Sequence, residues 1–387
     1  YAEGFDGDGD WSGTKRFFIT QDDDLDQINS EEVEDLGEVN MADSKTLIDF
    51  VTWAAENYPA DKYVLILSDH GSGWPGGFSD GDSKSASKNE LIDGFGDMIY
   101  LNEFDEAMAE IQQETGIDKF EMIGMDACLM GQLEVLSVLQ PYARYAVLSQ
   151  EVEPALGWAY AGFLKQLVAK PDSVDGAALA KKVVTTYINE DTVILDDARR
   201  AQYVEENYEG SGNISATALA KEESKPITLA AYDLSKVPAL LSSVDELAQA
   251  MSGINQKVVA RARSHTQAFE SVYGDDDPSP YIDLGNFAKL IKNESTSPKV
   301  SSASDKVRAA IKDAVIEEKH GSDKKGAMGV TIYFPNSALF KTDGTDYKTY
   351  VEVADRFGQE SLWPGFLNFH YTGQPLSQTS KPVAPEN

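Results

Sequence analysis

Short apolar runs alternate with helical patterns through the first part of the chain. Residues 63–68 (YVLILS) and 120–125 (FEMIGM) are continuous apolar runs, which predict strands buried on both faces of a sheet, and residues 143–149 predict a third strand. Other segments predict a strand at 16–20 and helices at 44–57 (with Ser44 as N-cap), at 102–114 and through Leu133, Leu136 and Leu139. Strands that alternate with helices of this length are joined by right-handed crossovers, so we expect an α/β fold with a largely parallel sheet.

The second half of the chain is richer in helical patterns. These cover residues 173–188, 234–250, 255–272, 284–291 and 304–316, with strand candidates at 227–232 and 328–334. The polar stretch 196–224 is the best candidate for an internal boundary, and the Pro/Ser-rich end predicts a flexible tail or linker. We therefore divide the chain into an N-terminal acidic loop (1–13), an α/β core (14–200), a helical and strand-containing C-terminal part (201–372) and a tail (373–387).

Composition and charge narrow the possible functions. The chain has 387 residues, and its 33 lysines and arginines against 65 aspartates and glutamates give a formal net charge of −32. Nucleic acids and anionic membrane surfaces bind proteins through clustered Lys and Arg, so both are excluded as leading partners. The longest apolar runs are far too short to cross a bilayer. Tyr1 in place of a methionine predicts a trimmed or processed start.

A histidine and the single cysteine each follow one of the predicted buried strands. The first strand leads into His70 and the second leads into Cys128, 58 residues further along the chain. Ligands of open α/β sheets bind beyond the carboxyl ends of the strands, and this spacing leaves room for one crossover between neighbouring strands. We therefore expect the two side chains to meet at one edge of the sheet, although a lone cysteine is more commonly buried and unreactive.

This pair has the chemistry of a nucleophile and a base. A thiol becomes a strong nucleophile when a base or a positive field lowers its pKa. We expect His70 to be that base, and later the acid that protonates the leaving amine. The helix predicted directly after Cys128 would favour the thiolate through its N-terminal amides. The backbone N–H groups of Gly71 and Cys128 are the expected oxyanion hole.

The residues around this pair resemble the clostripain family of cysteine peptidases, in the clan that also holds caspases, gingipains, legumains and separases. The resemblance rests on the motifs DHGSGW from Asp69 and MDACLMG from Met125, with shorter matches at 149–151, 154–160 and 363–367. It covers roughly residues 11–371. It implies a caspase-like α/β/α sandwich with a largely parallel central sheet and a helical C-terminal extension. It also implies a cysteine endopeptidase that cleaves after Arg or Lys.

The resemblance further implies how a basic P1 side chain is bound. Asp126, two positions before Cys128, matches the acid that holds this side chain, and a carboxylate can pair bidentately with an arginine. The alternative is that Asp126 is a turn or cap residue before the helix. Relatives often have another small or acidic residue where this chain has Ala155 and Leu156. This departure leaves the breadth of the pocket open.

Other residues near the proposed site are candidates for contact with the substrate. The departure from the family pattern leaves Glu151 or Glu153 as the source of a second acid, and Ser149 and Trp158 belong to the same matching segment. Trp74 and Trp158 either wall the substrate cleft or pack in the core.

The segment between the two catalytic strands is a candidate for self-cleavage. Residues 75–89 are rich in Gly, Ser and Asp, which predicts an exposed loop suited to nicking, and relatives are commonly activated by cleavage there. Lys84 is the preferred bond and Lys88 the second basic residue, which would give light and heavy chains that stay associated. The alternative is that both lysines are ordinary solvated charges.

The chemistry requires no cofactor, but some relatives need calcium. Asp6, Asp8 and Asp10 have the alternating spacing of a calcium loop, although Trp11 stands at the required glycine position and no Glu stands at the twelfth. Further acidic clusters lie at 22–24 and 275–277, and acidic runs are more commonly solvated surface. With one cysteine and four histidines, a catalytic zinc site is not expected.

Two alternative functions stay open. A caspase-like binding module without activity would keep the fold but not a working dyad, and a transpeptidase or ligase would pass the thioacyl group to an amine instead of water. A serine hydrolase is disfavoured because no G-x-S-x-G motif follows a predicted strand. The partners expected are proteins or peptides with Arg or Lys at P1. Strong acidity without a possible disulfide suits an exported bacterial protein, which is extracellular or associated with the cell envelope.

Overall fold

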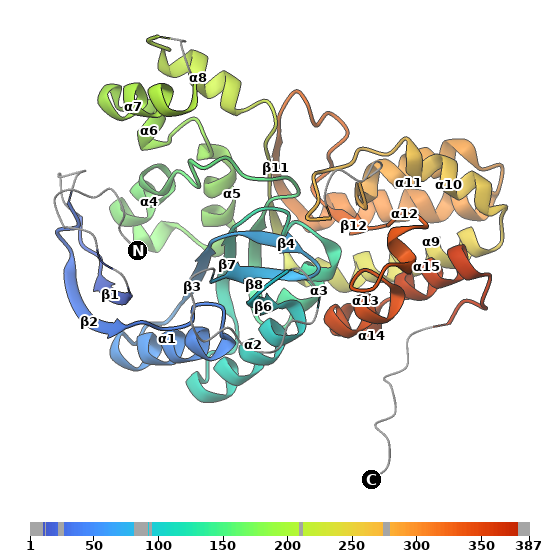
Figure 1. Ribbon diagram of the computed structural model, residues 1–387, viewed down its shortest axis with the longest axis horizontal. Coiled ribbons are helices and arrows are strands. Elements are labelled where there is room, and N and C mark those ends of the chain that lie inside the picture. Colours follow the sequence, from blue (N-terminus) through green and yellow to red (C-terminus); the bar gives the residue numbers. More distant parts are fainter. Residues whose placement is uncertain are drawn as a thin grey trace.

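A five-stranded sheet runs through the middle of the molecule (Figure 1). The structure is a computed structural model, and it describes residues 11, 13–21, 27–80, 92, 95–208, 212–273 and 279–377. In their order across the sheet, the strands are β11 (Val315–His320), β9 (Thr228–Asp233), β8 (Ala143–Leu148), β7 (Phe120–Asp126) and β3 (Val64–Ser68). Strands β3, β7 and β8 are parallel, whereas β9 and β11 are antiparallel to their neighbours. The sheet is thus mixed, and its parallel part leads to His70 and Cys128.

Helices cover both faces of this sheet. The interior strand β7 sends Met122 into the core on one face and Ile123 and Met125 into the core on the other, as the alternation of a buried strand requires. The first face is covered by α4 (Tyr160–Ala169) and α5 (Gly176–Thr186). The helices that pack in the core of the second face are α1 (Ser44–Asn57), α2 (Leu101–Thr115), α3 (Leu133–Leu139), α9 (Val237–Ser252) and α12 (Pro298–Ala314). The result is a three-layer α/β/α sandwich.

A second, smaller sheet continues the chain from the end of β3. It consists of β4 (Gly71–Gly73), β5 (Gly76–Ser79) and β6 (Met98–Tyr100), which are antiparallel to one another. Helix α2 begins directly after β6, at Leu101. Strands β5 and β6 pair with each other and lie on either side of residues 81–91 in the sequence. Residues 81–91 lie outside the described residues.

The C-terminal part packs against the second face and reaches the loop after β7. It contains the two-stranded sheet of β10 (Tyr281–Asp283) and β12 (Thr331–Tyr333). Beside it lie the helices α10 (Gln256–Ser264), α11 (Leu284–Glu294), α13 (Tyr347–Val353), α14 (Asp355–Glu360) and α15 (Trp363–Thr372). The N–H of Thr331 donates to the carbonyl of Gly131 over 2.8 Å, so β12 supports the loop that carries Cys128.

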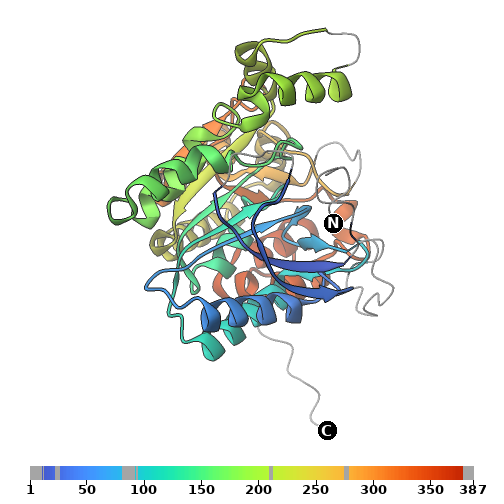
Figure 2. The ribbon, with the colours of Figure 1, turned by 90° about the vertical axis from the view of Figure 1, so that its left-hand side faces the viewer.

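Two further units lie at the periphery. Helices α6 (Thr192–Leu195), α7 (Asp197–Asn207) and α8 (Ala216–Glu223) project from the body of the molecule in both views (Figures 1 and 2). They have a small core of their own, with Ile194, Val204 and Leu219. The hairpin of β1 (Thr14–Phe18) and β2 (Glu31–Gly37) lies on the side of the sheet near α1.

The predicted α/β sandwich is confirmed, and several local predictions are corrected. Strand β3 is an edge strand with exposed Val64, not a strand buried on both faces. The N-cap of α1 is Asp43, whose carboxylate accepts from the N–H of Lys45, and not Ser44. Part of the predicted loop 75–89 is strand β5, and its Gly76, Gly77 and Phe78 are buried.

The boundary stretch and two helical predictions also differ from the structure. The polar stretch 196–224 forms α7 and α8, and the strands on either side of it, β8 and β9, are neighbours in one sheet. The pattern at 255–272 ends as a helix at Ser264. The pattern at 304–316 ends at Ala314, where β11 begins, because the polar sequence VIEEKH is an edge strand that needs few apolar residues.

Candidate active site

His70 lies on the connection between the two sheets. It follows β3 directly and precedes β4, and its side chain is exposed. Its carbonyl accepts from the N–H of Phe78 over 2.9 Å, and its own N–H donates to the carboxylate of Asp69. The backbone of His70 is therefore held from both sides while its imidazole is open to solvent and to a substrate.

Cys128 lies two residues beyond the end of β7, in a turn with an unusual backbone conformation. Leu129, which follows it, has φ of 66°, and this left-handed conformation is rare for a residue with a branched side chain. Such conformations persist only where surrounding contacts hold them, and they concentrate at functional sites. Here the N–H of Leu129 donates to the carbonyl of Glu151 over 3.2 Å and that of Gly131 donates to the carbonyl of Ser149 over 2.6 Å.

The fold brings the two predicted catalytic residues to the same edge of the sheet. The expected pairing of their strands is confirmed, since Ser68 of β3 is in register with Asp126 of β7. Beyond the strands, the N–H of Asp69 lies 3.4 Å from the carbonyl of Asp126. A Cβ atom placed on Gly71 would lie 2.1 Å from the carbonyl oxygen of Cys128. His70 is therefore flanked by two residues that both touch the segment carrying Cys128.

The surroundings of the thiol differ from those expected. Burial raises the pKa of Cys128, and the carboxylates of Glu151 and Glu270 raise it further, whereas the N–H of Glu153 lowers it. This N–H lies 3.3 Å from Sγ. Helix α3 begins only at Leu133, five residues later, so its amides do not adjoin Cys128 as the sequence predicted. The N–H of Glu153 takes the place of the expected helix terminus.

Asp126 and Glu153 form a buried acidic pair beside the thiol. The carboxylate of Asp126 accepts from the N–H of Trp158 over 3.3 Å and from the hydroxyl of Tyr160 over 3.0 Å. Gly157, with φ of 64°, lets the backbone pass close to this carboxylate. These contacts show that Asp126 does not cap a helix; it is held at the end of β7 by the chain leading into α4.

Glu153 has one carboxylate oxygen that accepts no hydrogen bond from a donor group of the described residues. Its Oε1 accepts from the indole of Trp158 over 3.3 Å, whereas its buried Oε2 accepts from no donor in the described part of the chain. Burial raises the pKa of Glu153 well above its ordinary value, and the hydrogen bond with Asp126 and the charge of that residue raise it further. A buried acid with an unused acceptor beside a second acid is the arrangement that a cation would satisfy.

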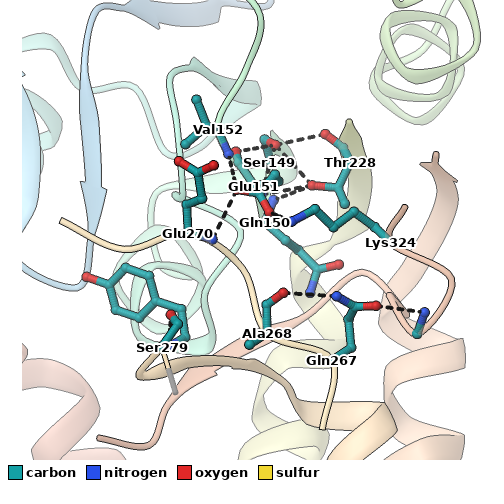
Figure 3. Close-up of polar contacts among 12 residues, drawn as sticks. Ser149, Gln150, Glu151, Val152, Thr228, Gln267, Ala268, Glu270, Ser279 and Lys324 are labelled. Atoms are coloured by element: carbon teal, nitrogen blue, oxygen red, sulfur yellow. Dashed lines mark hydrogen bonds and ion pairs between the residues drawn. The ribbon is translucent and has the colours of Figure 1, made fainter. Parts of the chain in front are cut away.

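The structure does not support substrate contacts for two of the predicted residues. The side chain of Ser149 is fully buried, and its hydroxyl donates to the carbonyls of Glu151 and Thr228. The carboxylate of Glu151 is also buried and forms an ion pair with Lys324 (Figure 3). Both side chains are thus used in holding the protein together, and of the two glutamates only Glu153 faces Asp126.

The two tryptophans have different surroundings. Trp74 is fully buried among Tyr273, Tyr333 and Tyr350, so it packs in the core and does not wall a cleft. Trp158 is also buried, but its indole N–H reaches Glu153. It therefore lies behind the acidic pair and supports it.

The sequence alone does not indicate that several other residues belong to the site. Tyr160 lies in a family-matching segment, but only the structure shows its hydroxyl on Asp126. Lys324 and Glu270 lie in segments remote from either motif. Nothing in their local sequence distinguishes them from other charged residues on loops, because what places them near the thiol is the packing of the C-terminal part.

Other predicted sites fall outside the described residues or show ordinary contacts. Lys84 and Lys88, Asp6, Asp8 and Asp10, and the acidic clusters at 22–24 and 275–277 all lie outside the described residues. Among the residues that are described, no group of three or more His, Cys, Asp or Glu side chains is placed to hold a metal ion. None of the helices described is long and apolar enough to cross a membrane. The side chains of His265, His320 and His370 bond to neighbouring residues away from the site.

The chain is similar to proteins of one family and to solved structures of the same fold. The model of the clostripain family matches residues 14–369. Clostripain of Hathewaya histolytica is 26% identical over 332 residues, and the match covers 77% of this chain and 58% of that relative. The chain thus spans less than two thirds of the length of this relative.

Two solved structures share the fold. One is a secreted cysteine protease of Bacteroides thetaiotaomicron in complex with an irreversible peptide inhibitor, with a TM-score of 0.56 and 18% identity; the match covers 89% of this chain and 85% of that one. The other is an inactive zymogen protease of Parabacteroides distasonis, with a TM-score of 0.55 and 17% identity, covering 85% of this chain and 80% of that one.

Proposed function

Because the chain belongs to the clostripain family, we propose that it is a cysteine endopeptidase that cleaves peptide bonds after Arg or Lys. The observation that carries the proposal is the meeting of the segments with His70 and Cys128 at the ends of two paired parallel strands. Cys128 is the proposed nucleophile and His70 the proposed base. Cys128 is the single cysteine of the chain. His70 is exposed, and the residues on either side of it, Asp69 and Gly71, contact the segment that carries Cys128.

The proposed reaction proceeds through a thioacyl enzyme. His70 takes the proton of the Cys128 thiol as Sγ attacks the scissile carbonyl, and it then gives this proton to the leaving amine. Water hydrolyses the thioester in the second half of the reaction, with His70 again acting as the base. The N–H groups of Gly71 and Cys128 are the proposed donors to the oxyanion.

Specificity for a basic P1 residue is proposed to come from Asp126 and Glu153 together. The adjoining carboxyl groups of Asp126 and Glu153 support this assignment, since Oε2 of Glu153 accepts from no donor group of the described residues and a guanidinium or ammonium group would satisfy both acids. Tyr160 and Trp158 hold the two acids from behind. The strongly acidic chain would also attract cationic substrates, less so as salt screens the field.

Self-activation, export and calcium are further parts of the proposal. Cleavage after Lys84, or after Lys88, would activate the enzyme, and the inactive zymogen among the structural neighbours supports a form that needs processing. A secreted structural neighbour supports an extracellular or envelope-associated site of action. A calcium requirement, with Asp6, Asp8 and Asp10 as candidate ligands, is tested by assaying activity in the presence of a chelator and after calcium is added back.

A fluorogenic P1 scan tests the central proposal. Peptides that differ only in the P1 residue (Arg, Lys, Gln, Glu) are assayed with the wild type, Cys128→Ala and His70→Ala. We expect hydrolysis of the Arg and Lys peptides by the wild type, and loss of at least about a thousandfold in both variants. Hydrolysis that persists in Cys128→Ala would contradict the dyad, and equal rates on Arg and Glu peptides would contradict the specificity.

Two further measurements separate the alternatives. An arginine chloromethylketone should label Cys128 irreversibly, whereas a silent binding module would leave the thiol unlabelled. Product analysis in the presence of an added amine tells hydrolysis from transpeptidation, because a ligase would give the amide product in place of the acid.

A further inference from the structure

A buried ion pair between Glu151 and Lys324 lies close to the proposed nucleophile. Glu151 belongs to the connection between β8 and α4, and Lys324 to the loop that joins β11 to β12. Their side chains are 3% and 17% exposed. The Lys324 ammonium also lies 5.8 Å from the centre of the Phe269 ring. The pair therefore joins two segments that are remote in sequence, in surroundings that water screens poorly.

Glu151 contacts the residue that follows Cys128 and also the backbone next to the donor that reaches the Cys128 thiol. Its carbonyl accepts from the N–H of Leu129, the residue after the nucleophile, over 3.2 Å. Its carboxylate Oε1 accepts from the N–H of Val152 over 2.9 Å and from that of Glu270 over 3.1 Å. The next N–H along the chain, that of Glu153, is the one that points at Sγ from 3.3 Å. The Glu151 carboxylate therefore holds the N–H of Val152, the residue directly before this donor; Figure 3 shows Glu151 with Val152, Glu270 and Lys324.

The charges around the thiol make the cation important. Glu151 faces the thiol from the β8–α4 connection and Glu270 from the segment after α10, and Asp126 lies at the end of β7. Glu153, whose pKa is raised by burial and by Asp126, adds a further negative charge only once it has released its proton. Two positive charges compensate these negative ones. Lys324 neutralises Glu151 in the ion pair, and His70 contributes a positive charge when it is protonated. Without Lys324, Glu151 would be an unpaired negative charge beside a group that must itself become negative.

We propose that Lys324 is a positioning residue for the nucleophile: by anchoring and neutralising Glu151, it keeps the Glu153 N–H on Cys128 Sγ and favours the thiolate. The inference rests on the proposed function only in naming Cys128 as the nucleophile. Lys324 does not touch the substrate, and it acts through Glu151. The C-terminal part of the chain thereby controls the reactivity of a residue in the first half.

The rate of alkylation of Cys128 by iodoacetamide as a function of pH tests this proposal, because it reports the thiol directly and requires no peptide hydrolysis. We expect Lys324→Met to raise the apparent pKa of the thiol by about one unit, which is a tenfold slower alkylation at neutral pH. Lys325→Met is the matched control: Lys325 is the next residue, is exposed, and carries the same charge. It should leave the profile at its wild-type position.

The partner of the ion pair gives the reverse test. Adding Glu151→Gln to Lys324→Met should restore most of the alkylation rate, because the amide oxygen can still accept from Val152 and Glu270 without a charge. If Lys324→Met does not fold, Glu151→Gln alone should speed alkylation several-fold. A folded Lys324→Met with the profile of Lys325→Met, or an unchanged rate in Glu151→Gln, would overturn the proposal. A shifted thiol profile in a chain that cleaves no peptide would instead count against the proposed function alone.

Discussion

Gly71 lies directly against the carbonyl oxygen of Cys128, where an added Cβ would be 2.1 Å away. Gly71 follows the proposed base His70, so this contact packs the backbone beside the base directly against the backbone of the proposed nucleophile. A shift of either backbone would displace the other. The contact explains why the position beside His70 has no side chain.

Gly71→Ala should therefore impair catalysis severely. A methyl group would push β4 away from the cysteine loop, and we expect kcat/KM to fall by at least a hundredfold, since small misplacements of catalytic groups have effects of this size. Gly253→Ala is the control, because a Cβ there has its nearest contact at an ordinary 3.6 Å. Similar activity in the two folded variants would show that the close approach has no catalytic importance.

We expect Asp126 to contribute more than Glu153 to the binding of a basic P1 side chain. Asp126→Asn should lower kcat/KM for Arg and Lys peptides by a hundredfold or more, and Glu153→Gln by about tenfold, because the first removes a charge held by Trp158 and Tyr160. Neither should slow iodoacetamide alkylation. The pKa of Glu153 is raised, so it releases its proton as the pH rises, and binding of a P1 cation should tighten in that direction.

The variant Tyr160→Phe provides the control for this pair. It keeps the ring and removes only the hydroxyl on Asp126, so KM for Arg peptides should rise a few-fold with little change in kcat. If Glu153→Gln left the pH dependence of KM as in the wild type, the second acid would have no role in binding.

Glu134 should make the stability depend on pH. It is fully buried in α3, where it accepts from the N–H of Tyr333 over 3.0 Å and from the hydroxyl of Tyr350 over 2.5 Å. Burial raises its pKa from 4.5 to about 7. Between these two values the folded state holds a proton that the unfolded state has released. The free energy of unfolding must therefore fall as the pH rises through this window, by an amount on the order of 3 kcal/mol.

Glu134→Gln should remove most of this fall. Denaturant unfolding between pH 5 and pH 8 is the measurement, and the variant should lose less stability than the wild type over that range. Glu352→Gln, which removes an exposed carboxylate from α13, should behave as the wild type does. Parallel curves for the wild type and Glu134→Gln would contradict the proposed titration.

Cleavage after Lys84 should leave the two products associated. Strands β3 and β7 pair along five residues, β5 pairs with β6, and α1 packs against α2, and in each case the partners lie on opposite sides of the cleaved segment. We expect one peak in size-exclusion chromatography, two chains in a denaturing gel and a mass for the shorter chain that ends at Lys84. Lys84→Ala should delay the cut, and full activity of an intact chain would contradict activation by cleavage.

The sequence was most informative about the two motifs and the strands that lead to them. Apolar runs and strand order are enough to predict that the segments carrying His70 and Cys128 meet at one edge of the sheet, because parallel strands joined by one crossover place their carboxyl ends together. The edge position of β3 was missed, since an apolar run says nothing about how many neighbours a strand has. The small sheet β4–β6 was also missed, because its glycines resemble a loop when only the local pattern is considered.

Local sequence patterns cannot predict which residues support the site, because long-range packing decides this. Glu153 was one of two equal candidates for the second acid, and the choice is made by Lys324, which occupies Glu151. Likewise Trp74 and Trp158 look alike in sequence, each following a glycine near a motif. Their different surroundings arise from the packing of β12 and α13 against one and of the acidic pair against the other.

The position of β9 and β12 in the chain has a consequence for biosynthesis. Both reactive side chains are synthesised by residue 128, yet the strand beside β8 ends at Asp233, and the contact of Thr331 with the cysteine loop comes later still. Pairings between segments so distant in sequence form late, because a long stretch of chain must be ordered first. A growing chain on the ribosome would therefore carry a thiol and an imidazole without the framework that holds them until the segment with Thr331 has also been synthesised.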